Sequence, residues 1–132
     1  MACPGDGKCR PREKLELRDC ERRTAADATF VVDRARTSHG HEGHTFRVAN
    51  TDLCLQRMGR RGRAVRLRRC RAGRAAQVFA GFDAEARRFD LRPVEFAERC
   101  LTNHHHPKEG ETIFAETCQK AHKTNTGYWV AY

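Results

Sequence analysis

Arginine is the residue whose type and spacing in this chain most clearly indicate a chemistry. The segment from Arg57 to Arg74 holds nine arginines and no acidic residue. The other 17 of the 26 basic residues are balanced by 17 acidic ones, so this segment accounts for the whole net charge of +9. A guanidinium group forms paired hydrogen bonds with sulfate, phosphate or carboxylate. The segment therefore predicts an anion-binding surface for acidic glycans, nucleic acid or an acidic protein; the alternative is a solvated basic strand that serves solubility alone.

Two of these arginines have the spacing of a strand. Arg66 and Arg68 alternate with Val65 and Leu67, and a strand places alternate side chains on opposite faces. We therefore expect both arginines to point outward from one face, with Arg63 just before the strand. Stacking aromatics usually accompany single-stranded nucleic-acid sites, and this segment has none. Nucleic acid is therefore expected only as a non-specific electrostatic partner.

Histidine offers a second kind of chemistry, in two clusters. His39, His41 and His44 surround Glu42 in one segment, and residues 104–106 are three successive histidines in another. Imidazole clusters bind zinc, copper or nickel, and they titrate near neutral pH. We prefer the simpler interpretation of exposed polar loops, and we predict neither a metal nor a cofactor.

Nothing in the sequence has the arrangement of a catalytic site. We find no nucleophile elbow, no phosphate-binding loop and no ordered metal triad. The single serine, Ser38, lies beside the first histidine cluster. We therefore predict that the protein is not an enzyme.

Cysteine offers a third kind of chemistry, the disulfide. Six of the seven cysteines fall in register with an internal repeat, as Cys9–Cys20, Cys54–Cys70 and Cys100–Cys118. One disulfide per repeat would add roughly 2–4 kcal/mol of stability each and indicates an oxidising compartment, so we predict a secreted or extracellular protein. The alternative is that these are buried free thiols of a cytosolic protein. Cys3 has no partner in this scheme.

Segments that target or anchor a protein are not visible in the chain. The first residues lack the apolar stretch of a signal peptide. No apolar run approaches the roughly 18–20 residues that a membrane span needs, so no span is expected.

The elements that position these residues come from a threefold repeat. Each copy has the pattern apolar-x-apolar-x-x-Cys, and each has a downstream aromatic residue. The blocks are 15–20, 65–70 and 113–118, and the aromatics are Phe30, Phe79 and Trp129. A fixed period indicates one supersecondary unit that is copied, with neighbouring copies completing one core. We place the repeats at roughly 1–49, 50–95 and 96–132, within a single domain, and expect the three aromatics to be equivalent core residues.

Period-2 alternation between turn-forming residues predicts short strands throughout. The expected strands are Lys8–Arg10, Leu15–Asp19, Thr29–Val32 and Thr45–Val48, then Leu53–Arg57, Val65–Arg69, Gln77–Ala80 and Arg87–Leu91, then Cys100–Thr102, Thr112–Glu116 and Tyr128–Tyr132. The segments Thr37–His44 and Asn103–Gly110 are expected to be exposed loops. The third repeat thus lacks its closing strand, unless residues 1–4 supply it. The predicted class is all-β, as a small antiparallel barrel with pseudo-threefold symmetry.

The second and third repeats resemble the ricin B-type lectin domain. The motifs that carry the resemblance are Asp52-Leu53-Cys54-Leu55-Gln56, Val65-x-Leu67-x-x-Cys70, Gln77-Val78-Phe79 and Arg99-Cys100-Leu101-Thr102, with Cys118 and Trp129. The resemblance covers most of the chain and is weak in the first repeat. It implies a β-trefoil, one disulfide in each repeat, and carbohydrate binding without catalysis.

The sugar-site positions of that family hold other residues in this chain. Its Asp two residues after the first cysteine is replaced by Pro11, Gln56 and Thr102. Its stacking aromatic two residues before the second cysteine is replaced by Arg18, Arg68 and Glu116. Its Asn-Gln pair is replaced by Asp27-Ala28, Ala76-Gln77 and Thr126-Gly127.

These replacements change the expected ligand. We predict a carbohydrate-binding, lectin-like module that prefers sulfated or otherwise acidic glycans. The candidate ligand-binding residues are Arg63, Arg66, Arg68, Gln56, Gln77 and Thr102. The alternative is a β-trefoil that binds a protein partner, inhibitor-like or ligand-like, without any sugar.

Overall fold

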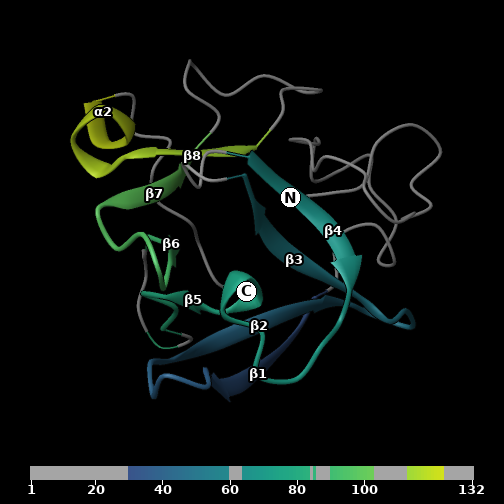
Figure 1. Cartoon of the computed structure of the whole chain (residues 1–132). Coiled ribbons are helices and arrows are strands. Elements are labelled where there is room, and N and C mark those ends of the chain that lie inside the picture. Colours follow the sequence, from purple (N-terminus) through teal and green to yellow (C-terminus); the bar gives the residue numbers. More distant parts are fainter. Residues whose placement is uncertain (1–29, 60–63, 84, 86–89, 103–112, 124–132) are drawn as a thin grey trace, which may run out of the picture.

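The structure is a computed structural model, and it describes residues 30–59, 64–83, 85, 90–102 and 113–123 (Figure 1). Several predictions lie outside these residues: the Cys9–Cys20 disulfide, Arg63, Trp129, the second histidine cluster, and the strands expected at 8–10, 15–19 and 128–132. Whether the third repeat has a closing strand is likewise outside the described part.

The described chain is mostly β-sheet, and every strand pairing in it is antiparallel, as the all-β prediction requires. The strands are β1 (Phe30–Arg36), β2 (Glu42–Val48), β3 (Leu53–Met58), β4 (Ala64–Arg69), β5 (Phe79–Ala80), β6 (Arg92–Pro93), β7 (Arg99–Thr102) and β8 (Phe114–Thr117). Their order in the sheet is β6-β5-β2-β3-β4-β8-β7, and β1 pairs with β2.

The two ends of this sheet come together. Leu101 N, on β7, donates a 2.9 Å hydrogen bond to the carbonyl of Leu91, which directly precedes β6. Figure 1 shows the resulting arrangement, in which the strands are distributed around a central space. Because β6 and β7 end the strand path, this contact curls the sheet around a shared core.

Alternation within the strands decides which side chains fill that core. Leu55 and Leu67 lie opposite each other and are buried, as are Leu101 and Ala115 in the β7–β8 pair. The predicted core aromatic Phe79 is also buried and packs against other apolar side chains of the core, whereas Phe30 is half-buried at its margin. Burial of these side chains supplies most of the stabilisation of a small sheet protein.

The hairpins β3–β4 and β7–β8 are built alike. Cys54 lies opposite Arg68, and Cys100 lies opposite Glu116, so each first cysteine faces the residue two before its partner cysteine. Each second cysteine closes its hairpin with the same bond: Cys70 N donates to Asp52 O, and Cys118 N donates to Glu98 O. The repeat seen in the sequence therefore exists as a structural unit in these two copies.

The two predicted disulfides that fall on described residues are formed. Cys54 and Cys70 are joined, with their Cα atoms 5.0 Å apart, and Cys100 and Cys118 are joined, with theirs 4.9 Å apart. Two disulfides are compatible with an extracellular protein. Within the described residues, no helix has the length and apolar character to cross a membrane.

Several strand predictions were wrong in detail. The segment predicted as a strand at Gln77–Ala80 begins instead with the 3₁₀ turn η1 (Ala75–Gln77), and only Phe79–Ala80 is extended. Of the strand expected at Arg87–Leu91, the structure describes only residues 90 and 91, and neither belongs to a strand; the two-residue β6 starts at Arg92. The helix α2 (Cys118–Lys123) was not predicted, because six residues are too few to produce a helical period.

The predicted exposed loop Thr37–His44 is also shorter than expected. Strand β1 runs to Arg36 and β2 begins at Glu42, so the hairpin loop spans only 37–41. Thr37 is buried, and its Oγ1 accepts a hydrogen bond from the backbone N–H of His41. Local side-chain bonding of this kind stabilises a tight turn that polarity alone does not reveal.

Candidate functional site

The outer face of β4 carries the two arginines on which the prediction depended. Val65 and Leu67 are buried, while Arg66 and Arg68 are half-buried on the opposite face of the strand. Across the ladder, Arg66 lies opposite Gln56, and Arg68 lies opposite Cys54. The structure therefore places both arginines on the outer face of the sheet, as their alternation with Val65 and Leu67 predicts.

Arg68 has hydrogen-bonding capacity that the described chain does not use. Its Nε is buried and makes no hydrogen bond with any described residue. A buried donor without an acceptor costs roughly 1–3 kcal/mol, and an anionic oxygen is the acceptor that suits a guanidinium best. Beyond β4, Arg71 and Arg74 are exposed in the turn that leads into η1.

Other arginines of the basic segment are held by ion pairs. Arg57 Nη2 lies 2.6 Å from Glu95 Oε1, and the guanidinium lies 4.8 Å from the centre of the Phe96 ring. Arg69 Nε lies 3.2 Å from Asp52 Oδ2 on the surface. The segment is therefore not a uniform run of free cations, because the described residues Arg57 and Arg69 join parts of the scaffold.

Gln56 and Gln77, proposed as ligand-binding residues, lie inside the protein. Gln77 is 1% exposed, and its Nε2 donates to Gln56 Oε1 at 2.9 Å and to the carbonyl of Arg69 at 2.8 Å. Its Oε1 accepts from the backbone N–H of Arg71 at 2.9 Å. These bonds fasten η1 over the outer face of β3, so both amides are engaged in holding the fold together.

The described strands of the third repeat, β7 and β8, offer no equivalent cationic face. Thr102, the remaining candidate on described residues, is fully buried in β7. Glu116, at the position of Arg68, is 6% exposed, and its Oε1 accepts a 2.9 Å hydrogen bond from the backbone N–H of Thr117. Arg99 Nη1 lies 3.8 Å from the same oxygen. Of the two equivalent hairpins, only β3–β4 therefore presents arginine on its outer face.

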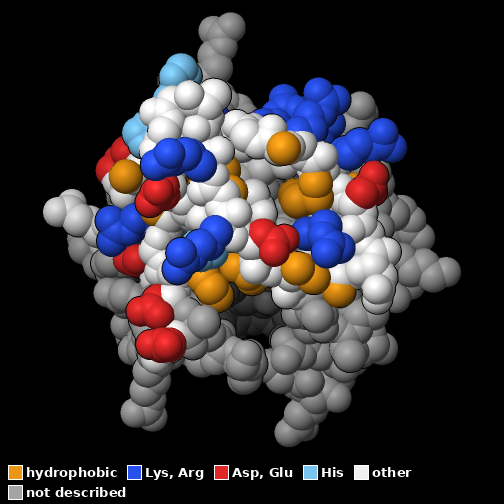
Figure 2. Space-filling view, turned by 90° about the horizontal axis from the view of Figure 1, so that it is seen from below, with side chains coloured by type: hydrophobic (Ala, Val, Ile, Leu, Met, Phe, Trp, Pro, Cys, Tyr) orange, Lys and Arg blue, Asp and Glu red, His pale blue; other side chains and the backbone are white. Residues whose placement is uncertain are grey.

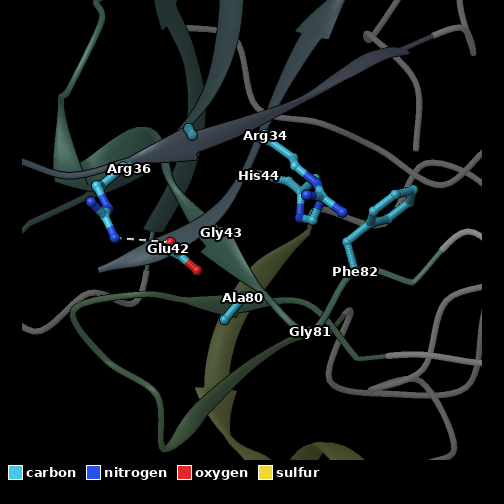
Figure 3. Close-up of a pocket in the computed structure, with 9 residues that line it drawn as sticks. Arg34, Arg36, Glu42, Gly43, His44, Ala80, Gly81 and Phe82 are labelled. Atoms are coloured by element: carbon cyan, nitrogen blue, oxygen red, sulfur yellow. Dashed lines mark hydrogen bonds and ion pairs between the residues drawn. The ribbon is translucent and has the colours of Figure 1, made fainter. Parts of the chain in front are cut away.

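A groove that the sequence did not reveal lies between the β1–β2 hairpin and the chain just after β5. Its volume is about 570 Å³. Figure 3 shows its lining residues: Arg34, Ala35, Arg36, Glu42, Gly43, His44, Ala80, Gly81 and Phe82. Figure 2 shows the face of the molecule on which β1, β2 and β5 lie, where basic and acidic side chains alternate with apolar ones.

The polar lining of this groove continues the core-facing side of the β1–β2 hairpin. Val32 pairs with Phe46 in the core; two residues further along, Arg34 pairs with His44, and then Arg36 pairs with Glu42. Period-2 alternation puts all three pairs on one face. The sequence contains this alternation. It does not show that the end of β5 and the residues after it, Ala80 to Phe82, form the opposite wall of the groove.

The structure does not bring the side chains of the first histidine cluster together. His39 and His41 are exposed, whereas His44 lines the groove and makes an edge-on contact with the Phe82 ring, 5.0 Å between centroids. Among the described residues, no three His, Cys, Asp or Glu side chains are grouped closely enough to hold a metal ion. His44 therefore belongs to the groove rather than to a metal cluster.

Comparison with known proteins adds no relative. Models of known protein families, curated proteins and solved structures were all searched, and none matches the chain.

Proposed function

We propose that this protein is a non-catalytic, β-trefoil carbohydrate-binding module that prefers anionic glycans. The ligand contact lies on the outer face of β4, where Arg66 and Arg68 are two residues apart on one side of the strand. Arg71 and Arg74 add positive charge beside this face without being part of the contact itself.

The observation that carries this proposal is that Arg66 and Arg68 share the outer face of β4 and that no described carboxylate forms an ion pair with Arg68. A sulfate or carboxylate group bound to the Arg68 guanidinium would neutralise its charge. The neighbouring arginines raise the local concentration of a polyanion, and this effect falls as salt is added. A neutral galactoside gains nothing from either property.

The trefoil assignment, and with it the kinship to ricin B-type lectins, is part of the proposal. It is supported by the two equivalent disulfide hairpins and by the curled antiparallel sheet. Secretion is supported by the same two disulfides, which persist in oxidising compartments.

Chromatography on immobilised heparin at low and moderate salt tests the proposal. The wild-type protein should be retained at low salt and should not bind neutral galactosides at either salt. An Arg66→Gln/Arg68→Gln variant should bind roughly tenfold or more weakly, since each hydrogen bond to a charged group contributes about 1.5–3 kcal/mol.

The matched control is Arg71→Gln/Arg74→Gln, which removes the same charge from the exposed turn. It should weaken heparin binding less than the variant in β4. Equal losses in the two variants would mean that diffuse charge accounts for binding, and that the outer face of β4 is no specific site. Retention of wild-type affinity by the β4 variant would also overturn the proposal.

A second function, binding of a protein partner, is favoured by the burial of Gln56, Gln77 and Thr102. These three candidates for a sugar site have no surface to offer a hydroxyl group. A glycan array with neutral and sulfated glycans separates the two functions: no binding at either salt would leave the protein partner as the better hypothesis.

A further inference from the structure

We propose that the groove between the β1–β2 hairpin and β5 is a second ligand site, which binds a monosaccharide unit bearing one carboxylate, such as a uronic acid. The inference deepens the proposed glycan binding and rests on it for the class of ligand. It uses none of the side chains on the outer face of β4.

The shape of the groove depends on positions where a side chain does not fit. A Cβ on Gly43 would lie 2.5 Å from the carbonyl oxygen of Phe79 and 2.8 Å from Val78 Cγ1. Gly81 has a φ of 92°, and a Cβ there would collide with the carbonyl oxygen of Asp90. Backbone therefore forms these walls, and the volume of about 570 Å³ lies within the 300–1,000 Å³ typical of small-molecule sites.

Arg34 is the anion-binding group of the groove. Its side chain is exposed, it makes no ion pair with any carboxylate in the described chain, and it extends toward His44 and Phe82 (Figure 3). A guanidinium in this position matches the two oxygens of a carboxylate. Its partner across the ladder is His44, not an acid, so no described residue competes for it.

Phe82 supplies the apolar wall that a sugar ring needs. The ring is half-buried and is fixed by two edge-to-face contacts, with His44 at 5.0 Å and Phe46 at 5.6 Å between centroids. The C–H face of a pyranose packs against such a ring while its carboxylate reaches a cation nearby. Arg34 and Phe82 both line the groove, so one ligand in it can contact both (Figure 3).

The pair at the far end of the groove adds no net charge to it. Arg36 Nη2 lies 3.0 Å from Glu42 Oε1, and the two side chains are 69% and 76% exposed. This pair is neutral overall and offers donors and acceptors for hydroxyl groups. Because the pair carries no net charge, it gives no net attraction to a second anionic group, and Arg34 is left as the one unpaired cation among the described lining residues.

An NMR titration of the isotope-labelled protein tests this inference with two separate probes that have the same pyranose ring. Methyl β-glucuronide carries the carboxylate, and methyl β-glucoside replaces it with a hydroxymethyl group. Saturable shifts of the Gly43 and Gly81 amides are expected with the glucuronide and not with the glucoside. Equal shifts with both probes, or none with the glucuronide, would overturn the inference.

Variants separate this groove from the outer face of β4. Arg34→Gln should raise the dissociation constant for the glucuronide roughly tenfold or more, because it removes the charged partner. Arg71→Gln, an equal charge change in an exposed turn, should leave that constant unchanged. An unchanged constant in Arg34→Gln, or an equal rise in Arg71→Gln, would contradict the proposed role of the groove.

The Arg66→Gln/Arg68→Gln variant makes the two proposals distinguishable. It should keep glucuronide binding while its heparin binding weakens as expected above. If heparin binding fails in the wild type while the glucuronide still shifts Gly43 and Gly81, then the outer-face site is wrong and the groove stands. If heparin binds as expected but the glucuronide does not shift Gly43 and Gly81, only the proposal for the groove is wrong.

Discussion

The hairpins β3–β4 and β7–β8 are two copies of one scaffold with different surfaces. Both have the same register, the same disulfide and the same closing hydrogen bond from the second cysteine. Yet Arg68 on the outer face of the first is replaced by Glu116 in the second, where Arg99 lies nearby. The scaffold is fixed by inward side chains and cysteines, so the outward positions were free to diverge in charge.

That difference is the reason for placing the proposed ligand site in one copy. An anionic ligand would meet a half-buried guanidinium on β4, but it would meet a buried carboxylate at the equivalent place on β8. Repetition of a fold unit therefore does not imply repetition of a site. Stability measurements on the two hairpins sharpen this comparison. Substitutions in the shared scaffold should lower the free energy of unfolding similarly in both hairpins, although their surfaces differ.

The largest effect is expected from Leu67→Ala, which gives β3–β4 the Leu–Ala pair that β7–β8 has at Leu101 and Ala115. Leu67 is fully buried, so the substitution leaves a cavity and should lower the free energy of unfolding by about 2–5 kcal/mol in urea denaturation. Met58→Ala, at a half-buried strand end, is the control and should cost less. Equal losses would mean that Leu67 contributes no more to the core than a side chain at the strand end.

The next effect compares the two disulfides. Their cysteines are separated by 16 and 18 residues, so loop closure predicts nearly equal contributions of about 3 kcal/mol each. Cys54→Ala/Cys70→Ala and Cys100→Ala/Cys118→Ala should therefore lower the free energy of unfolding by similar amounts. Alanine pairs are preferable to chemical reduction, which also reaches the other cysteines of the chain. A strongly unequal result would show that one hairpin has its own source of stability.

The smallest effect concerns a feature found in β3–β4 and η1. Gln77→Ala leaves the Arg71 N–H, the Arg69 carbonyl and the Gln56 amide without their partner, which should cost about 2 kcal/mol. Gln119→Ala, in the exposed part of α2, is the matched control and should be nearly neutral. If Gln77→Ala kept full stability yet lost glycan binding, Gln77 would be a ligand residue after all.

Prediction from sequence was most successful where structure is local. The strands at Leu53–Arg57 and Val65–Arg69 were placed within a residue or two. In each strand apolar residues recur at every second position, and this period can be read from the strand's own sequence. The pairing of Cys54 with Cys70 followed from the repeat. Gln77, by contrast, was assigned to a ligand because it stands at the Asn-Gln position of the sugar site in the family that the chain resembles, and nothing in its neighbourhood revealed that Gln56 would lie against it.

The sequence by itself determined the antiparallel strands, two of the disulfides and the outward direction of Arg66 and Arg68, because these depend on residue spacing and short-range pairing. Only the tertiary structure decided which polar side chains are buried and where a groove opens. Gln56 and Gln77 lie 21 residues apart, and Arg34 lies far along the chain from Phe82. Such contacts depend on how the sheet curls and on which backbones approach closely, and no local period in the sequence records that.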